Sequence, residues 1–109
     1  MSNKTPIYRW SGEYFGFIYN GYLFDADSNY LGWVEDNGSA WNQDGTYLGE
    51  LIEGNYILHN SVKIEPIPKI PKIPPIPPTP PIPKIDKIGK IGRLGWEDAL
   101  DRFRGGKDA

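Results

Sequence analysis

The first half of the chain repeats a short motif, and this repeat limits the possible folds more than any other feature. Each copy has the order tyrosine, apolar residue, glycine, any residue, aliphatic residue. The copies are residues 14–18, 30–34 and 47–51, at spacings of 16 and then 17 residues. Turn-forming pairs lie between or after them: Asn20-Gly21, Asn37-Gly38 and Gly54-Asn55. Such pairs are typical of β-hairpin tips, and the aromatic and β-branched residues around them favour strands. Each unit is therefore predicted to be one β-hairpin.

These hairpins are expected to associate, because a single two-stranded hairpin is only marginally stable in water. The repeated Gly16, Gly32 and Gly49 are predicted to lie where backbones crowd together or a strand bends. A fourth unit begins at Tyr56 but lacks its tyrosine-leucine-glycine half, and the nearest later match is residues 93–96. The predicted fold class is thus mainly β, an array of short hairpins.

The second half follows a rule of three residues. Apolar residues occupy every third position except Thr79: Ile64, Ile67, Ile70, Ile73, Ile76, Ile82, Ile85, Ile88, Ile91 and Leu94. A period of three fits neither an α-helix nor a strand, but it fits polyproline II, which the intervening prolines favour. The isoleucines then line one edge of the segment. A second, basic edge carries Lys69, Lys72, Lys84, Lys87, Lys90 and Arg93. Near the end, Gly89, Gly92 and Gly95 replace proline, which permits bending or close backbone approach.

Charge, proline content and aromatic content all change near Val62. Residues 1–62 carry a net charge of −6 and 13 of the 15 aromatic residues, whereas residues 63–109 carry a net charge of +4. Ten of the 11 prolines lie in the second part. We therefore predict a hairpin-repeat module over 1–62 and a polyproline II segment over 63–96. The remaining 97–109 are predicted to form a polar tail with a short helix, which places Trp96, Leu100 and Phe103 on one side.

The composition excludes several classes of site. The 109 residues contain no cysteine and one histidine, His59, which removes disulfides, thiolate nucleophiles and multi-histidine metal centres. No apolar run approaches the roughly 18 residues that a transmembrane helix needs, and the first residues lack a signal-peptide core. The net charge of −2 is not that of a basic nucleic-acid binder. We expect a soluble, cytoplasmic protein with no metal and no cofactor, which does not bind nucleic acid.

The isoleucine edge is expected to be buried, because soluble monomers seldom leave such a stripe uncovered. Each buried isoleucine contributes roughly 1.5–3 kcal/mol. The first half of the chain is the preferred partner, since aromatic-lined grooves bind proline-rich helices and its charge is opposite to that of the tail. The alternatives are a second copy, another protein, or an anionic membrane surface. The run Pro74–Pro78 also has a proline spacing that SH3-like modules accept, although a self-docked tail would hide it.

Candidate catalytic chemistry is sparse. Residues 25–29 resemble the opening of a calcium loop with Asp36 at its twelfth position, but Tyr30 stands where that loop needs glycine. Two carboxylate pairs, Asp25 with Asp27 and Glu35 with Asp36, are candidates for acid–base catalysis if they are buried. Both pairs lie in predicted turns, where carboxylates are normally solvated. His59 has a serine nearby but nothing that orients it as a base. Hairpin turns and a surface histidine are the preferred interpretations, and no enzymatic activity is expected.

The two halves together resemble a known family. Hairpin repeats with tyrosine-leucine-glycine, followed by isoleucine-proline-lysine triplets that end in Leu94-Gly95-Trp96, are similar to the four-fold beta flower proteins over about residues 7–96. The family is functionally uncharacterised, so the resemblance implies a fold and no activity. That fold is a pseudo-symmetric array of short hairpins, arranged like petals around a four-fold axis. This chain departs from the pattern in its incomplete fourth petal and in its extension after Trp96.

The predicted function is that of a non-catalytic binding or scaffold module. Six repeated aromatic residues are candidates to line a pocket for a small apolar or planar ligand near the symmetry axis: Trp10, Tyr14, Tyr30, Trp33, Trp41 and Tyr47. Their alternative role is in a shared hydrophobic core. The alternative function is an adaptor whose basic, isoleucine-striped tail binds a partner protein or an anionic membrane surface.

Overall fold

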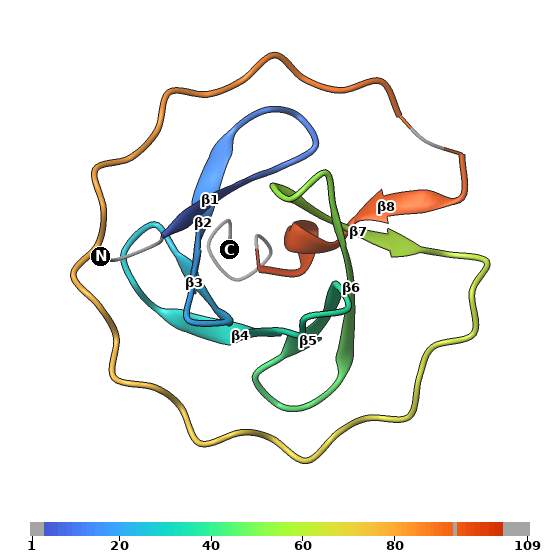
Figure 1. Cartoon of the computed structure of the whole chain (residues 1–109). Helices are drawn as coiled ribbons and strands as arrows, with labels where there is room; N and C mark the ends of the chain where they lie inside the picture. Colours follow the sequence, from blue (N-terminus) through green and yellow to red (C-terminus); the bar gives the residue numbers. More distant parts are fainter. Residues whose placement is uncertain (1–3, 93, 104–109) are drawn as a thin grey trace.

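The structure, a computed structural model, describes residues 4–92 and 94–103, and of Arg102 the backbone only. It contains eight strands and one short 3-10 helix. They are β1 (Thr5–Tyr8), β2 (Tyr14–Tyr19), β3 (Tyr22–Asp25), β4 (Tyr30–Val34), β5 (Ser39–Asn42), β6 (Tyr47–Ile52), β7 (Tyr56–Asn60), β8 (Trp96–Asp98) and η1 (Ala99–Phe103). Each strand pairs with the next along the chain, so the eight strands form one antiparallel sheet, which curls around a central axis (Figure 1). The predicted mainly β hairpin array is confirmed.

The hairpin tips explain where the chain reverses. At the β2–β3 tip, Asn20 and Gly21 both have positive φ, 53° and 82°, as two-residue hairpin turns of the favoured primed types allow. Glu53 and Gly54 do the same at the β6–β7 tip, with φ of 55° and 80°. This second tip lies one residue earlier than the sequence predicted.

The repeated glycines lie where two strands approach each other closely. A side chain at Gly16, Gly32 or Gly49 would collide with the backbone of the paired strand, so the predicted crowding is confirmed. The register also shifts once within each of the pairs β1–β2, β3–β4 and β5–β6. Such bulges bend a strand and increase its twist. Glycines and bulges together allow the sheet to curl tightly.

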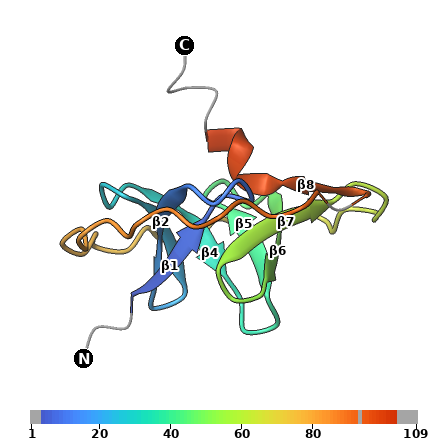
Figure 2. The ribbon, with the colours of Figure 1, turned by 90° about the horizontal axis from the view of Figure 1, so that it is seen from above.

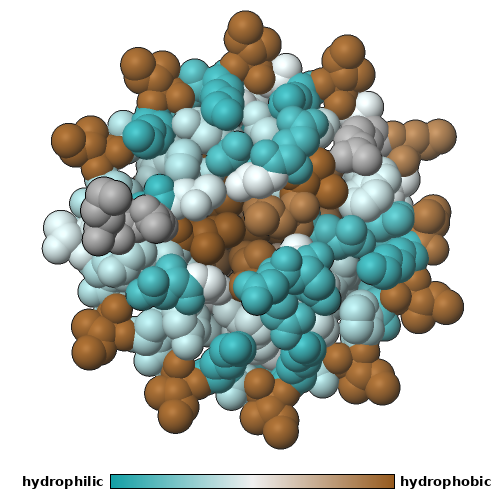
Figure 3. All heavy atoms as spheres, in the orientation of Figure 1, coloured by the Kyte–Doolittle hydropathy of each residue, from teal (hydrophilic) through white to brown (hydrophobic). Residues whose placement is uncertain are grey.

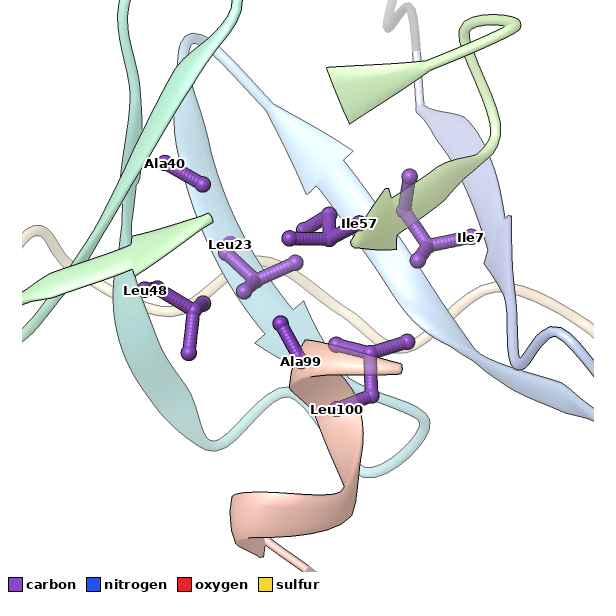
Figure 4. Packing of buried hydrophobic residues seen from close by; sticks show 7 residues of the cluster. All are labelled: Ile7, Leu23, Ala40, Leu48, Ile57, Ala99 and Leu100. Carbon is purple, nitrogen blue, oxygen red and sulfur yellow. The ribbon is translucent and has the colours of Figure 1, made fainter. Parts of the chain in front are cut away.

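The hydrophobic core lies on the axis around which the sheet curls. Seven aliphatic side chains converge there (Figure 4): Ile7, Leu23, Ala40, Leu48, Ile57, Ala99 and Leu100. Four of them come from β1, β3, β5 and β7 at spacings of 16, 17 and 17 residues, one from each petal. All seven are at most 3% exposed. The axis is therefore filled by side chains, and it is closed at one end by η1.

The missing half of the fourth petal comes from beyond the proline-rich segment. β8 pairs with β7, where Asn60 faces Trp96. The Asp98 carboxylate accepts a hydrogen bond from the backbone N–H of Trp10 over 3.0 Å, and Asp101 of η1 pairs with Arg9. The C-terminal segment therefore links the last petal to the first.

The predicted C-terminal helix begins later and is shorter than expected. Trp96 lies on strand β8, and only Ala99–Phe103 are helical. Leu100 is fully buried and Phe103 is half-buried against the core, which stabilises a helix too short to form alone. Within the described residues, no helix is long and apolar enough to cross a membrane. The predicted polar tail over 104–109 lies outside the described residues.

The proline-rich segment encircles the sheet. It leaves β7, passes around the petals and returns at β8, at nearly one level along the axis (Figures 1 and 2). The paired residues at its ends, Asn60 and Trp96, are 36 positions apart. At the rise of ~3.1 Å per residue of polyproline II, that length closes a circle ~35 Å across. The two larger dimensions of the molecule are 37 and 36 Å. The polyproline II conformation itself stays a prediction.

Candidate binding surface

Main-chain hydrogen bonds fix the ring of residues 63–95, which we call the tail, to the sheet. The Lys69 N–H donates to the carbonyl of Gly45 over 2.8 Å, and the Lys87 N–H donates to the carbonyl of Gly12 over 2.7 Å. Gly12 and Gly45 hold the same place in equivalent turns, and both have positive φ, 99° and 92°. A side chain at either glycine would collide with the tail backbone. These turns are thus shaped to receive the tail.

The lysine edge of the tail faces the sheet. Five ammonium groups lie 4.5–5.7 Å from the centroids of aromatic rings: Lys63 over Tyr47, Lys69 over Trp41, Lys72 over Trp33, Lys87 over Tyr8 and Lys90 over Tyr56. Three of these lysines also pair with carboxylates at 2.5–3.1 Å: Lys63 with Glu50, Lys69 with Glu35 and Lys90 with Glu53. Aromatic faces and carboxylates both attract cations. The basic edge is therefore used to hold the tail.

The isoleucine edge points away from the sheet. The nine isoleucines from Ile64 to Ile91 are 86–92% exposed, and Leu94 is fully exposed. These ten residues, which we call the isoleucine belt, project around the rim of the molecule (Figure 3). The prediction that this stripe packs on residues 1–62 is wrong. The lysine edge faces the sheet instead, because it supplies cations to the aromatic rings and carboxylates and N–H donors to the turn carbonyls.

The tail changes the acidity of Glu35. Its carboxylate accepts hydrogen bonds from Lys69 Nζ at 2.5 Å and from Trp41 Nε1 at 3.2 Å. The hydrogen bond from Lys69 lowers the pKa of Glu35 from its ordinary value of 4.5, because it favours the charged form. A carboxyl group whose pKa is lower in the folded state stabilises the fold at pH values above its pKa in the unfolded state. That stability is lost as the pH falls through the folded pKa.

We therefore expect a pH-dependent effect of the substitution Glu35→Gln. The melting temperature of the variant should lie below that of the wild type at neutral pH, and the gap should close as the pH falls from about 6 to about 3. Thermal unfolding followed by circular dichroism measures this gap. Glu97→Gln is the control, because Glu97 is exposed, and its gap should stay near zero. A gap for Glu35→Gln that is constant across the pH range would contradict the prediction.

Three of the six candidate aromatic residues form one buried cluster under the tail. Trp33 and Trp41 stack with ring centroids 6.4 Å apart, and Tyr47 meets Trp41 edge-on at 5.4 Å. Lysines of the tail cover all three rings. This cluster is separate from the aliphatic core on the axis.

The other three candidates lie apart from this cluster. The Trp10 indole N–H donates to the carbonyl of Ile91 over 2.9 Å, and the backbone N–H of Tyr14 donates to the Asp86 carboxylate over 2.9 Å. Tyr30 packs edge-on against another tyrosine of its own petal. The structure therefore uses Trp10 and Tyr14 to hold the tail and does not bring the six residues together. Their predicted role in ligand binding stays a prediction.

The expected arrangement of these residues around the axis is wrong, because aliphatic side chains fill the axis. A cleft of about 340 Å³ lies instead at the perimeter, between the β2–β3 tip and the end of β4. Trp33, Glu35 and Lys72 are among the residues that line it. The indole N–H of Trp33 is buried and has no hydrogen-bond partner within the described part of the chain. Trp33 alone of the six candidates contributes to this cleft.

The acidic turn between β3 and β4 is a hairpin turn closed by its own first residue. The Asp25 carboxylate accepts hydrogen bonds from the backbone N–H groups of Asp27 and Asn29, both over 2.9 Å, a common way of stabilising a turn. His59 lies 3.0 Å from the carboxylate of Glu65. Over residues 4–92 and 94–103, no three histidine or acidic side chains gather in a group that could hold a metal ion.

The comparisons with known proteins bear on this architecture. The search of curated proteins and the search of solved structures each found no match. A family model described as 4-fold beta flower protein matches residues 1–100. This range contains all eight strands and the whole tail, including the segment that completes the fourth petal. Since the match covers nearly the full length, the chain belongs to the 4-fold beta flower protein family.

Proposed function

We propose that the chain is a non-catalytic interaction module that binds a partner protein through the isoleucine belt. The observation that supports this function is the outward orientation of all ten belt residues, each at least 86% exposed. Monomeric soluble proteins rarely expose a contiguous set of large aliphatic side chains, and such sets mark interaction sites. The sheet holds the tail by its lysine edge, which leaves the isoleucine belt free to contact a partner.

The energetics favour a partner that covers part of the belt. Burying one isoleucine contributes roughly 1.5–3 kcal/mol, so three or four neighbours contribute roughly 5–12 kcal/mol before the cost of association. The tail is already held against the sheet at Lys69 and Lys87, so little further ordering is needed when a partner binds. A prepared surface of this kind loses less entropy on binding than a free peptide would.

The charges favour a protein over an anionic membrane. Attraction to an anionic leaflet requires basic groups that are free to approach the lipid headgroups. Lys63, Lys69 and Lys90 are paired with carboxylates of the sheet, and the hairpin module carries a net charge of −6. The tail also runs at nearly one level along the axis (Figure 2), so the belt is a narrow band that suits a groove on a protein.

Site-specific photo-cross-linking tests this function. A benzophenone amino acid would replace Ile70 or Ile88 in the protein inside cells that produce it naturally. We expect discrete protein adducts from both positions and none from the same group at Asp27, which is exposed in the turn between β3 and β4. The adducts from Ile70 should disappear when its neighbours carry Ile67→Ser and Ile73→Ser, since a belt contact depends on these side chains.

Two results would contradict the proposal. Adducts formed mainly with lipid would indicate a membrane surface instead. Equal protein adducts from Ile70 and Asp27 would show that the belt is not the binding surface. The serine variants are suitable reagents because Ile67 and Ile73 are 86% and 88% exposed. Their free energy of unfolding should lie within about 0.5 kcal/mol of the wild-type value.

A further inference from the structure

One arc of the tail, residues 74–83, has no polar anchor. Lys69 and Lys72 hold the tail on one side of it, and Asp86 and Lys87 hold the tail on the other. Among the described residues, those of the arc make no hydrogen bond, ion pair or cation–π contact with the sheet. Within the described residues, its contact with the rest of the molecule is marked only by the partial burial of Pro75, Pro78 and Pro81.

The register of the tail explains this gap. Lys69 and Lys87 bind equivalent turns two petals apart, so nine tail residues pass each petal. This register places Pro78 beside the intervening turn, between β3 and β4. In that turn Ser28 stands where the other two turns have glycine, and its φ is 66°. Pro78 has no N–H to donate to that turn. A hydrogen bond found in the other two turns therefore cannot form here.

Two of the three edges of this arc face solvent. The inner edge consists of prolines that are half-buried against the sheet: Pro75, Pro78 and Pro81. The outer two edges carry three exposed pairs: Ile76-Pro77, Thr79-Pro80 and Ile82-Pro83. A polyproline II helix has three residues per turn, so two of its edges can contact a groove while the third edge faces away. The sheet already occupies the third edge.

The composition of the arc favours one kind of groove. Seven of the ten residues 74–83 are proline, and none is charged. Proline-rich segments dock in aromatic-lined grooves and lose little entropy, because proline restricts the free chain. Lys84 follows the arc and is exposed, and it makes no ion pair with any described residue.

We propose that residues 74–83 are a docking segment for a partner domain with an aromatic-lined, polyproline-binding groove. This inference rests on the proposed function and names the partner class for the part of the belt that contains Ile76 and Ile82. The sheet presents the segment by its inner edge, so the partner binds it without releasing the tail. The hairpin module acts as a frame that displays a preformed proline-rich ligand.

Isothermal titration of the whole 109-residue chain with purified domains tests the inference. The probes are one SH3, one WW and one EVH1 domain, which represent the known polyproline grooves. We expect at least one of them to bind with a micromolar dissociation constant. The double variant Pro77→Ala/Pro80→Ala should weaken that binding at least tenfold. The matched control is Pro68→Ala/Pro71→Ala, which changes two exposed prolines on the anchored side and should bind within twofold of the wild type.

The inference is overturned if none of the three domains binds the wild-type chain. It is also overturned if both double variants weaken binding equally, because the contact would then not be centred on the arc. Circular dichroism of each variant establishes that the fold is retained. Ile70 and Ile88, the cross-linking positions, lie outside the arc. If they gave protein adducts while none of the three domains bound the chain, the proposed function would stand and only this inference would be lost.

Discussion

Replacing Leu100 with alanine should lower the free energy of unfolding by about 2–5 kcal/mol, the usual range for a fully buried leucine. Leu100 is 0% exposed and packs with Ile7, Leu23 and Ile57 on the axis. The residue reaches this position only after the chain has passed around the whole sheet. The loss of its side chain would therefore weaken the core and the closure of the ring at the same time. Urea unfolding followed by circular dichroism measures the change.

Leu94→Ala is a matched control for this experiment. It makes the same substitution six residues earlier, at a side chain that is fully exposed, so the free energy of unfolding should change by no more than about 0.5 kcal/mol. If Leu100→Ala cost no more than Leu94→Ala, η1 would not pack over the axis in solution. An unchanged denaturant slope in both variants would show that the two proteins unfold as the wild type does.

The hairpin array could be predicted because its signals are local. Gly16, Gly32 and Gly49 recur with the petals, and the collision that a side chain would cause there explains why the residue repeats. The fourth petal could not be predicted with the same detail. Its second half, β8, is only three residues long and is separated from β7 by the tail. A match at residues 93–96 indicated the region, but pairing across so long a connection depends on the closure of the ring.

The orientation of the tail could not be derived from its period. A three-residue repeat places all isoleucines on one edge and the lysines on another, but it does not say which edge faces the sheet. Two kinds of residue decide this. Gly12 and Gly45 leave space for the tail backbone, and carboxylates such as Glu35 stand within reach of the lysines. The aromatic and acidic character of residues 1–62 suits a cation better than an isoleucine, and that signal is present in the composition.

The positions of the six repeated aromatic residues could not be derived from their spacing for a related reason. Aromatic repeats are consistent with a core, a pocket or a surface that binds another segment, and spacing alone does not distinguish them. The smaller aliphatic residues, one per petal, fit the crowded axis, as Ala40 and Leu23 illustrate. Trp33 and Trp41 are too large for that position and instead lie under the lysine edge.

Substituting alanine for Gly45 should release one part of the tail. The residue has a φ of 92°, and its added Cβ would collide with the backbone of Lys69. Left-handed conformation costs a non-glycine residue about 1–2 kcal/mol, and overpacking adds about 1–3 kcal/mol. Gly54→Ala separates the two causes, because Gly54 has a φ of 80° but nothing within 4 Å of the added atom. Gly54→Ala should therefore lower the free energy of unfolding only by the cost of the left-handed conformation, about 1–2 kcal/mol.

Limited trypsin digestion shows whether the extra cost of Gly45→Ala comes from the tail. The carbonyl of Gly45 accepts the N–H of Lys69, so the variant should be cleaved faster after Lys69 while cleavage after Lys87 keeps the wild-type rate. Gly12→Ala should give the reverse pattern, because the Gly12 carbonyl accepts the N–H of Lys87. Gly54→Ala should accelerate neither. If Gly45→Ala and Gly12→Ala each accelerated both cleavages equally, the tail would detach as one unit and the separate anchors would not act independently. Local acceleration would instead establish each turn as its own clamp, which is the property that lets one arc bind a partner while the rest of the ring stays in place.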